Sequence, residues 1–242
     1  MGPANPWRSA WRSVARTDTG KVRARNEDAF LDCPQHGLWA VADGMGGYQC
    51  GDVASQMIVT HLAELPEEGR FDERVIAVRK CLHWLNRRMS QELTITPDRR
   101  DSIMGSTVVA LLIDGKRGAC VWAGDSRCYL LREGRLHQLT RDHSLLEQLI
   151  DEQKMTPEQA SQYPNARALT RAIGASDQLK LEVLELEVCP GDVFLLCSDG
   201  FYQGLDNEMV REAMSLESLH TLFDEVRRGS ARDNLTAVVI SQ

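Results

Sequence analysis

The sequence has no long apolar run, no secretory leader and no zinc-type cysteine spacing. Its longest uninterrupted apolar stretch, VVALLI, is far shorter than the roughly 20 residues that a membrane-spanning helix needs. The N-terminal stretch MGPANPWRSAWRSVART lacks the apolar core of a signal peptide. The seven cysteines include no CxxC pair, which argues against a structural zinc site and favours free thiols in a reducing compartment. We therefore expect a cytoplasmic protein without membrane insertion.

A surplus of positive charge is also missing. The chain has 28 Lys and Arg against 35 Asp and Glu, a net charge of -7 and a pI near 5.4, whereas nucleic-acid binders carry a basic stripe. No linker rich in Pro, Gly or Ser divides its 242 residues, of which 43% are hydrophobic and 26% charged. We expect a single domain over residues 1–242, with residues 1–12 as a leader that can be mobile.

The apolar patterning predicts more strand than helix. Strand-like stretches are residues 13–17, residues 29–33, GLWAVAD, GSTVVALLID, RGACVWAG, RCYLLRE, LEVLELEV, DVFLLCSD and LTAVVIS. Helical spacing occurs over residues 52–64, 71–93 and 207–226, and in a further segment capped by Asp142 or Ser144. Asp114-Gly115 and Glu133-Gly134 fall where hairpin turns belong.

Acidic motifs recur at the ends of apolar runs. The sequences RARNED, VADGMGG, CSDG and RDN place Asp28, Asp43, Asp199 and Asp233 beside a glycine, an asparagine or another acid. Carboxylates gathered in this way suit hard divalent cations, and two such ions can activate water for attack on a phosphoryl group. Either arginine of RARNED, at positions 23 and 25, can bind the phosphate. Taken singly, each of these motifs is more often a tight turn or a helix cap than a metal site.

The ordered motifs resemble one known family. RARNED, VADGMGG, GSTVVALL, WAGDSRCYLLR, LTRDHS, LTRAIG, LLCSDG and DNLTAVVI follow one another as in the PPM, or type 2C, metal-dependent Ser/Thr protein phosphatases. The resemblance runs from about residue 13 to the C-terminus and is closest to the compact bacterial members. It implies an α+β fold, a four-layer αββα sandwich of two antiparallel sheets flanked by helices.

The resemblance also implies the metal ligands. Asp43 would bridge two Mn²⁺ or Mg²⁺ ions, and Asp199 and Asp233 would hold one of them. Gly44 would offer its carbonyl oxygen to the other ion. Asp125, in GDSR, matches the acid that forms a third, weaker metal site together with Asp199 in bacterial members.

Four further residues receive roles from the resemblance. Arg23 matches the phosphate-binding arginine, which leaves Arg25 as a bystander. Glu27 and Asp28 would act through bound waters, and Asn234 would orient Asp233. In the implied mechanism a hydroxide that bridges the metals attacks phosphoserine or phosphothreonine directly, with Arg23, Asp43 and Asp199 as the catalytic residues and no phosphoenzyme.

The chain departs from some members at one position. Those members have a histidine directly after the metal-binding Asp-Gly, proposed as the acid that protonates the leaving group, and this chain has Met45. His143 in RDHS is the nearest alternative, although a core or capping role fits it better. Residues 143–169 resemble the variable flap beside the catalytic cleft, and the same composition also fits a plain surface loop.

Other functions stay open at this point. An inactive relative would act as a binding module, and another metal-dependent enzyme would hydrolyse small phosphates or phosphodiesters. The resemblance favours a phosphoprotein phosphatase that is a monomer and acts opposite a bacterial Ser/Thr kinase and its targets.

Overall fold

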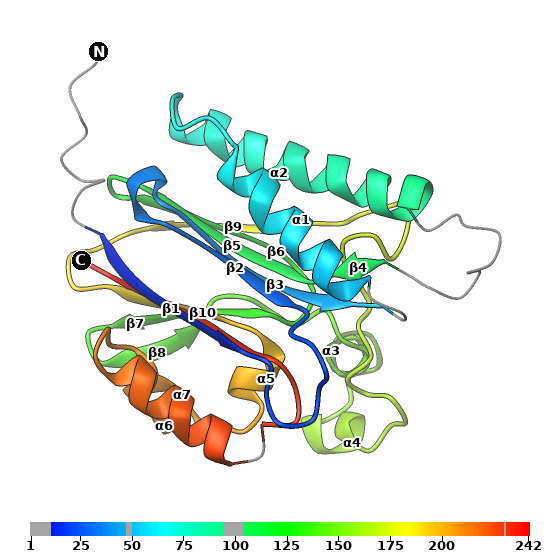
Figure 1. Ribbon diagram of the computed structural model, residues 1–242. Helices are drawn as coiled ribbons and strands as arrows, with labels where there is room; N and C mark the ends of the chain where they lie inside the picture. Colours follow the sequence, from blue (N-terminus) through cyan, green and yellow to red (C-terminus); the bar gives the residue numbers. More distant parts are fainter. Residues whose placement is uncertain (1–10, 47–49, 94–103, 230) are drawn as a thin grey trace.

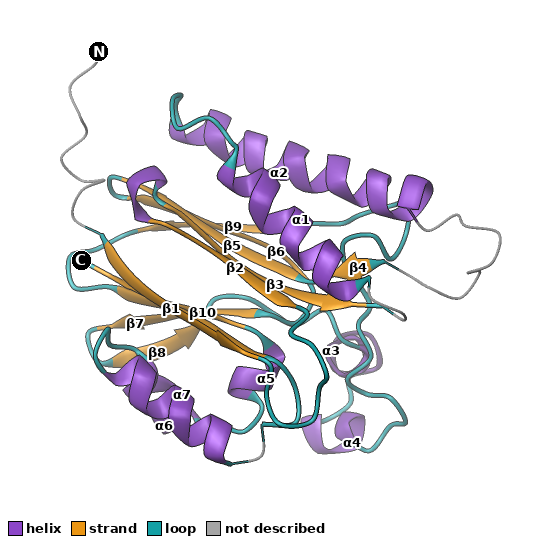
Figure 2. Cartoon of the chain, in the orientation of Figure 1, coloured by secondary structure: helices purple, strands orange, loops and turns teal. Residues whose placement is uncertain are grey.

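The computed structural model describes residues 11–46, 50–93, 104–229 and 231–242. Two antiparallel sheets pack face to face, and helices cover both outer faces (Figures 1 and 2). The predicted four-layer αββα sandwich is therefore confirmed. No helix in the described part of the chain is long and apolar enough to cross a bilayer.

Each sheet combines strands from distant parts of the sequence. The first has the order β1-β11-β10-β7-β8, built from Arg12–Asp18, Leu235–Ser241, Val193–Cys197, Arg127–Arg132 and Arg135–Gln138. The second has the order β2-β3-β5-β6-β9, built from Asp28–Cys33, Leu38–Met45, Val108–Asp114, Arg117–Ala123 and Glu182–Glu187, and the short β4 (Gly105–Ser106) pairs with β3.

Alternation along the strands divides the core. On β3, Trp39 and Val41 face the other sheet, while Ala40 and Ala42 face the helices, as expected for side chains that alternate between faces. Trp11 also enters the layer between the sheets, where its ring lies 6.4 Å from that of Trp39. Of the expected leader over residues 1–12, positions 1–10 lie outside the described residues, whereas Trp11 is buried and Arg12 begins β1.

Two of the expected helices differ in extent, and one short helix, Asp199–Tyr202, was not expected. The helices are α1 Gly51–Ala63, α2 Phe71–Arg87, α3 Leu145–Gln153, α4 Pro157–Ser161, α5 Asp199–Tyr202, α6 Asn207–Ala213 and α7 Ser218–Arg228. The helix expected over residues 71–93 ends at Arg87 and continues as a π-helical turn. The helix expected over residues 207–226 is wrong as one element, because the Ser215 hydroxyl accepts from the Ser218 amide and begins a new helix there.

The acidic motifs meet at one end of the sandwich. Asp28 at the start of β2 pairs with Asp43 near the end of β3. On the other sheet, Cys197 at the end of β10 pairs with Arg127 at the start of β7 and with Ala237 on β11. Asp125, Asp199 and Asp233 are each within a few residues of these paired positions. Both sheets therefore present their acids at the same end of the sandwich.

The segment over residues 143–169 contains two helices, and hydrogen bonds join its two ends. It holds α3 and α4, and Ser144 caps α3 by accepting from the Glu147 amide. Its two ends are joined, because the Leu145 amide donates to the Ala168 carbonyl and the Thr170 amide donates to the His143 carbonyl. A short helix in this region was predicted, and α4 is that helix.

Candidate metal centre

A cavity of about 260 Å³ opens at the acidic end of the sandwich. Its described lining residues are Arg23, Glu27, Asp43, Gly44, Met45, Gly46, Thr107, Asp125, Arg167, Leu169, Asp199, Asp233 and Asn234. Eight of the predicted site residues are therefore in one place, although their positions span most of the sequence. Asp28 is not on the wall, and Arg25 is not among the lining residues either.

Hydrogen bonds with Ser106 and Thr107 hold the backbone of Asp43 in place. The Thr107 hydroxyl accepts from the Asp43 amide at 3.1 Å, and the Asp43 carbonyl accepts from the Thr107 amide at 2.8 Å and the Ser106 hydroxyl at 2.9 Å. The strand that the sequence predicts to end at Asp43 continues to Met45, because β4 pairs with Gly44 and Met45 and extends it. The backbone is thus held rigidly while the carboxylate faces the cavity.

Two glycines allow the backbone segments of the site to come together. A Cβ on Gly44 would lie 2.0 Å from the Gly51 carbonyl oxygen and 2.5 Å from that of Glu27. A Cβ on Gly200 would lie 2.1 Å from the Asn234 carbonyl oxygen. Because contacts this short are impossible for a side-chain carbon, the glycine after each aspartate is required by packing, beyond any role in turning the chain.

Asp199 and Asp233 approach the cavity from α5 and from the turn before β11. Asp199 begins α5, and the Gln203 side-chain amide donates to its Oδ2 at 2.5 Å. Asp233 accepts the Asn234 amide on Oδ1 at 2.9 Å and the Arg23 guanidinium on Oδ2 at 2.7 Å. Both carboxylates are thus oriented by side chains or amides of the protein itself.

The two arginines of RARNED take different partners. Arg23 lines the cavity and pairs with Asp233, while Arg25 lies 3.8 Å from Asp52 of α1. The sequence alone left both open as phosphate ligands. The geometry favours Arg23, in agreement with the resemblance.

Asn234 joins the loop between β1 and β2 to the turn that precedes β11. Its Oδ1 accepts from the Glu27 amide at 2.8 Å, and its Nδ2 donates to the carbonyls of Thr19 and Arg25 at 2.8 and 2.9 Å. The side chain therefore fixes the RARNED loop against the Asp233 turn, which is a wider role than the predicted orientation of Asp233.

Asp28 lies beneath the cavity. Its Oδ2 accepts from the hydroxyls of Ser198 and Thr236, each at 2.7 Å, whereas its Oδ1 is buried without a hydrogen-bond partner among the described residues. A buried carboxylate oxygen without a donor is costly unless water or a cation satisfies it. This fits the expectation that Asp28 acts through bound water.

The carboxylates raise one another's pKa. Burial raises the pKa of Asp28 to about 6 and that of Asp125 to about 7, and the nearby charge of Asp199 adds to both. Burial also raises the pKa of Asp43 and that of Asp199, with further contributions from Asp28 and Asp233 respectively. Several buried acids held in such proximity are the condition that a bound divalent cation relieves.

The donor set fits Mn²⁺ or Mg²⁺. It consists of carboxylate oxygens and the Gly44 carbonyl, and these ions prefer oxygen ligands and keep several waters. Among the described residues, no three His, Cys, Asp or Glu side chains already form a complete metal-binding group.

The proton donor expected from the family is missing here. Met45 lines the cavity, and none of the described lining residues is a histidine. His143 is buried outside this cavity, and its Nδ1 accepts from the Gly124 amide at 3.0 Å. A structural role for His143, which the sequence favoured, therefore agrees with its position.

Sequence reasoning missed Arg167, Thr107 and Gln203. Arg167 lies in the turn after α4 and donates to Gln203 Oε1 at 2.7 Å, and Gln203 in turn donates to Asp199. Arg167 thus places a second guanidinium at the cavity, close to a predicted ligand. Its sequence context, PNARAL, carries no signal for this, because only the closed loop over residues 143–169 brings it there.

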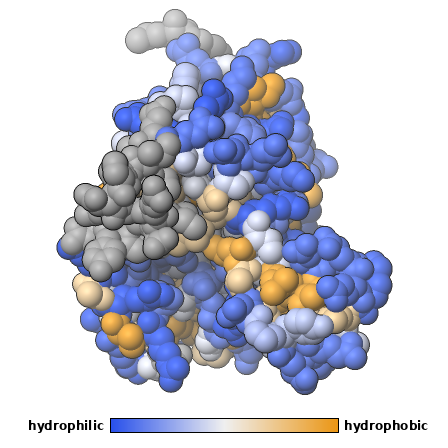
Figure 3. All heavy atoms as spheres, turned by 90° about the vertical axis from the view of Figure 1, so that its right-hand side faces the viewer, coloured by the Kyte–Doolittle hydropathy of each residue, from blue (hydrophilic) through white to orange (hydrophobic). Residues whose placement is uncertain are grey.

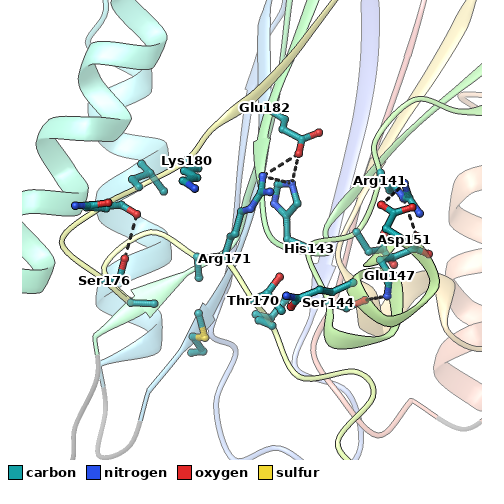
Figure 4. A pocket seen from close by; sticks show the side chains of 18 of the residues that line it. Arg141, His143, Ser144, Glu147, Asp151, Thr170, Arg171, Ser176, Lys180 and Glu182 are labelled. Carbon is teal, nitrogen blue, oxygen red and sulfur yellow. Dashed lines mark hydrogen bonds and ion pairs between the residues drawn. The ribbon is translucent and has the colours of Figure 1, made fainter. Parts of the chain in front are cut away.

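A larger cleft adjoins the metal cavity. It measures about 1000 Å³ and shares Met45, Gly46 and Leu169 with the smaller cavity. Figure 4 shows its charged and hydroxyl-bearing side chains, from α3 on one side and from residues 170–182 on the other. The face of the molecule that carries this region is mainly hydrophilic, with small apolar patches (Figure 3).

Comparison with known proteins agrees with the motif order. The protein phosphatase 2C family profile matches residues 20–239. The Ser/Thr protein phosphatase PstP of Mycobacterium tuberculosis is 36% identical over 232 residues, which are 94% of this chain. The chain spans only 44% of that relative's length. Protein phosphatase PhpP of Streptococcus pneumoniae is 30% identical, over 93% of this chain and 95% of its own.

Solved structures show the same fold. PppA, described as a key regulatory component of T6SS in Pseudomonas aeruginosa, aligns with a TM-score of 0.85 and 40% identity over 96% of this chain and 97% of its own. The catalytic domain of PstP in complex with two manganese ions aligns with a TM-score of 0.78 and 36% identity over 96% and 98% of the two chains. With its motifs in family order and its acids gathered at one end of a shared sandwich, the chain belongs to the protein phosphatase 2C family.

Proposed function

We propose that this protein is a metal-dependent Ser/Thr phosphoprotein phosphatase. The observation that carries the proposal is the single cavity that gathers Asp43, Asp125, Asp199 and Asp233 with Arg23. Relatives named Ser/Thr phosphatases support it, including one solved with two manganese ions. We further propose that residues 1–242 act as one catalytic domain.

The cavity residues divide into metal ligands and a phosphate ligand. Asp43, Asp199, Asp233 and the Gly44 carbonyl would hold two Mn²⁺ or Mg²⁺ ions, and Asp125 with Asp199 would hold a third. When bound, these ions supply charge neutralisation and a water of lowered pKa. Arg23 can turn from Asp233 to the phosphoryl oxygens, where a guanidinium forms paired charge-assisted hydrogen bonds.

No side-chain nucleophile is required. Thr107 carries the only hydroxyl among the described lining residues, and this oxygen is committed to the Asp43 amide and the Ser126 hydroxyl, 2.7 Å away. A cavity lined in this way favours direct attack by water on phosphorus, without a phosphoenzyme. Since Met45 has no proton to give, we propose that a water molecule in the cavity protonates the leaving serine or threonine oxygen.

The adjoining cleft favours a protein substrate. The 260 Å³ cavity has room for a phosphoryl group and its ligands, while the connected 1000 Å³ cleft can hold the peptide around the phosphorylated residue. We propose phosphoproteins as substrates, with the loop over residues 143–169 as the selecting flap. A Ser/Thr kinase and its targets as partners, a monomeric state and a cytoplasmic location complete the proposal.

Hydrolysis of a phosphothreonine peptide tests the function. We expect turnover with Mn²⁺, loss of turnover with chelator, and little hydrolysis of a phosphodiester under the same conditions. Turnover that persists in chelator would contradict the metal-dependent reading. Peptide binding without turnover would favour an inactive binding module, and preference for the phosphodiester or for small phosphates would favour another metal hydrolase.

A further inference from the structure

We infer that His143 is a positioning residue that fixes the Gly124-Asp125 turn, and through it the carboxylate of Asp125. The inference rests on the proposed function, in which Asp125 holds the third metal ion. His143 does not line the smaller cavity, although it lies on the wall of the larger cleft, so we infer that its effect on Asp125 passes through the backbone of Gly124.

Two hydrogen bonds join His143 to the same residue. The His143 amide donates to the Gly124 carbonyl at 2.9 Å, and the Gly124 amide donates to His143 Nδ1 at 3.0 Å. Gly124 has a φ of +114°, and a Cβ at this position would lie 2.5 Å from Thr107. A residue with a side chain is thus excluded, and the imidazole supplies the contact that holds this strained turn in place.

The bond from the Gly124 amide to Nδ1 determines the tautomer of His143. Because Nδ1 accepts a hydrogen bond, the proton of the neutral ring is on Nε2. Nε2 lies 3.2 Å from Glu182 Oε1, the acceptor that this tautomer needs. Arg171 Nη1 lies 2.8 Å from the same oxygen and 3.2 Å from His143 Nε2; with the Nε2 proton in place the guanidinium donates to Glu182, which then receives both donors (Figure 4). The opposite tautomer would set an N–H of the ring against the Gly124 amide.

Packing holds the ring in this orientation. His143 is only 6% exposed and stacks on Trp122, with ring centroids 6.1 Å apart and an interplanar angle of 9°. The Trp122 indole donates to the Arg141 carbonyl at 2.9 Å. Burial and the charge of Arg171 lower the pKa of His143, which keeps the ring neutral and Nδ1 free to accept.

The far side of the turn is already fixed by other residues. The Asp125 carbonyl accepts from the Tyr202 hydroxyl at 2.9 Å, and the Ser126 hydroxyl bonds to that of Thr107 at 2.7 Å. His143 is the corresponding support on the near side, at Gly124. Losing the imidazole would leave the near side of the turn held only by the backbone bond between the residue 143 amide and the Gly124 carbonyl.

The test compares His143→Phe with His143→Gln. Phenylalanine keeps the stacking on Trp122 but cannot accept from the Gly124 amide, whereas glutamine retains an acceptor. We expect His143→Phe to weaken binding of the weakest Mn²⁺ ion about tenfold by calorimetry, at the lower end of effects for outer residues of metal sites, while the two tighter ions bind as before. His143→Gln should recover part of the loss. Lys180→Ala, in the same cleft, is the control for this measurement and should bind all the Mn²⁺ ions with wild-type affinity.

Two further measurements keep the inference falsifiable. Thermal melting in chelator establishes that each variant folds, and if His143→Phe does not, Glu182→Leu tests the same chain of bonds and should also weaken the third ion. Nitrogen NMR of the wild-type imidazole should show the proton on Nε2. A proton on Nδ1, or unchanged binding of the third ion in folded variants, would overturn the inference. A wild-type chain that binds two ions and hydrolyses phosphopeptide would overturn it while leaving the proposed function intact.

Discussion

The Arg23 guanidinium donates to Asp233 Oδ2 at 2.7 Å, across 210 positions of sequence. This pair joins the residue expected to bind phosphate to one expected to bind metal. Asp233 also raises the pKa of Arg23 through their hydrogen bond. The same contact therefore holds the Arg23 side chain at the cavity and neutralises the charge of Asp233.

Alanine variants of Arg23 and Arg25 should distinguish the roles of the two arginines. We expect Arg23→Ala to lower kcat/KM for a phosphothreonine peptide about 100-fold, the typical cost of losing one preorganised donor. Arg25→Ala should change it less than about threefold, because Arg25 makes only a long, exposed contact with Asp52. Equal losses in both variants, measured by steady-state kinetics at saturating Mn²⁺, would contradict the assignment of Arg23.

Asp43 should control metal binding and stability in opposite directions. We expect Asp43→Asn and Asp43→Ala to abolish turnover and the calorimetric signal of the tight Mn²⁺ ions. In chelator, Asp43→Asn should melt at a higher temperature than wild type, because it removes one of several mutually repelling acids. Asp52→Asn on α1 is the matched control and should retain activity. Full activity of Asp43→Ala would exclude the proposed site.

The sequence predicted most of the fold and most of the cavity residues, because strand alternation and the order of motifs are local signals. It could not predict that β3 continues past Asp43 to Met45, since that depends on pairing with β4 across a long connection. It could not separate Arg23 from Arg25, since their acidic partners lie on distant elements. The break between α6 and α7 was missed because one serine hydroxyl competes with a continuous helical pattern.

The metal-free protein should lose stability as pH rises. The folded pKa of Asp28 is about 6 and that of Asp125 is about 7, both above the usual 3.8. The folded chain therefore holds protons that the unfolded chain has released, and stability from these groups is present at low pH and lost as pH rises through 6–7. In chelator we expect the melting temperature to fall by on the order of 5 °C between pH 5 and pH 8.

Saturating Mn²⁺ should remove this dependence, because bound cations favour the ionised carboxylates. The measurement is the difference between melting temperatures with Mn²⁺ and with chelator at each pH, which cancels groups outside the cavity such as His143. The difference should grow with pH. A difference that is constant or shrinks over this range would contradict the raised pKa values and the fit to metal.

Arg167 should influence the cavity through Gln203. It donates to Gln203, which donates to Asp199 Oδ2 at 2.5 Å, and it also lines the cavity directly. We expect Gln203→Ala to weaken metal binding without changing KM for peptide at saturating Mn²⁺, since it removes only the support of Asp199. Arg167→Ala should do both, because its guanidinium is also within the cavity where the phosphoryl group would bind. Steady-state kinetics over a range of Mn²⁺ concentrations separates the two effects. Identical behaviour of the two variants would show that Arg167 acts only through Gln203 and makes no contact with substrate.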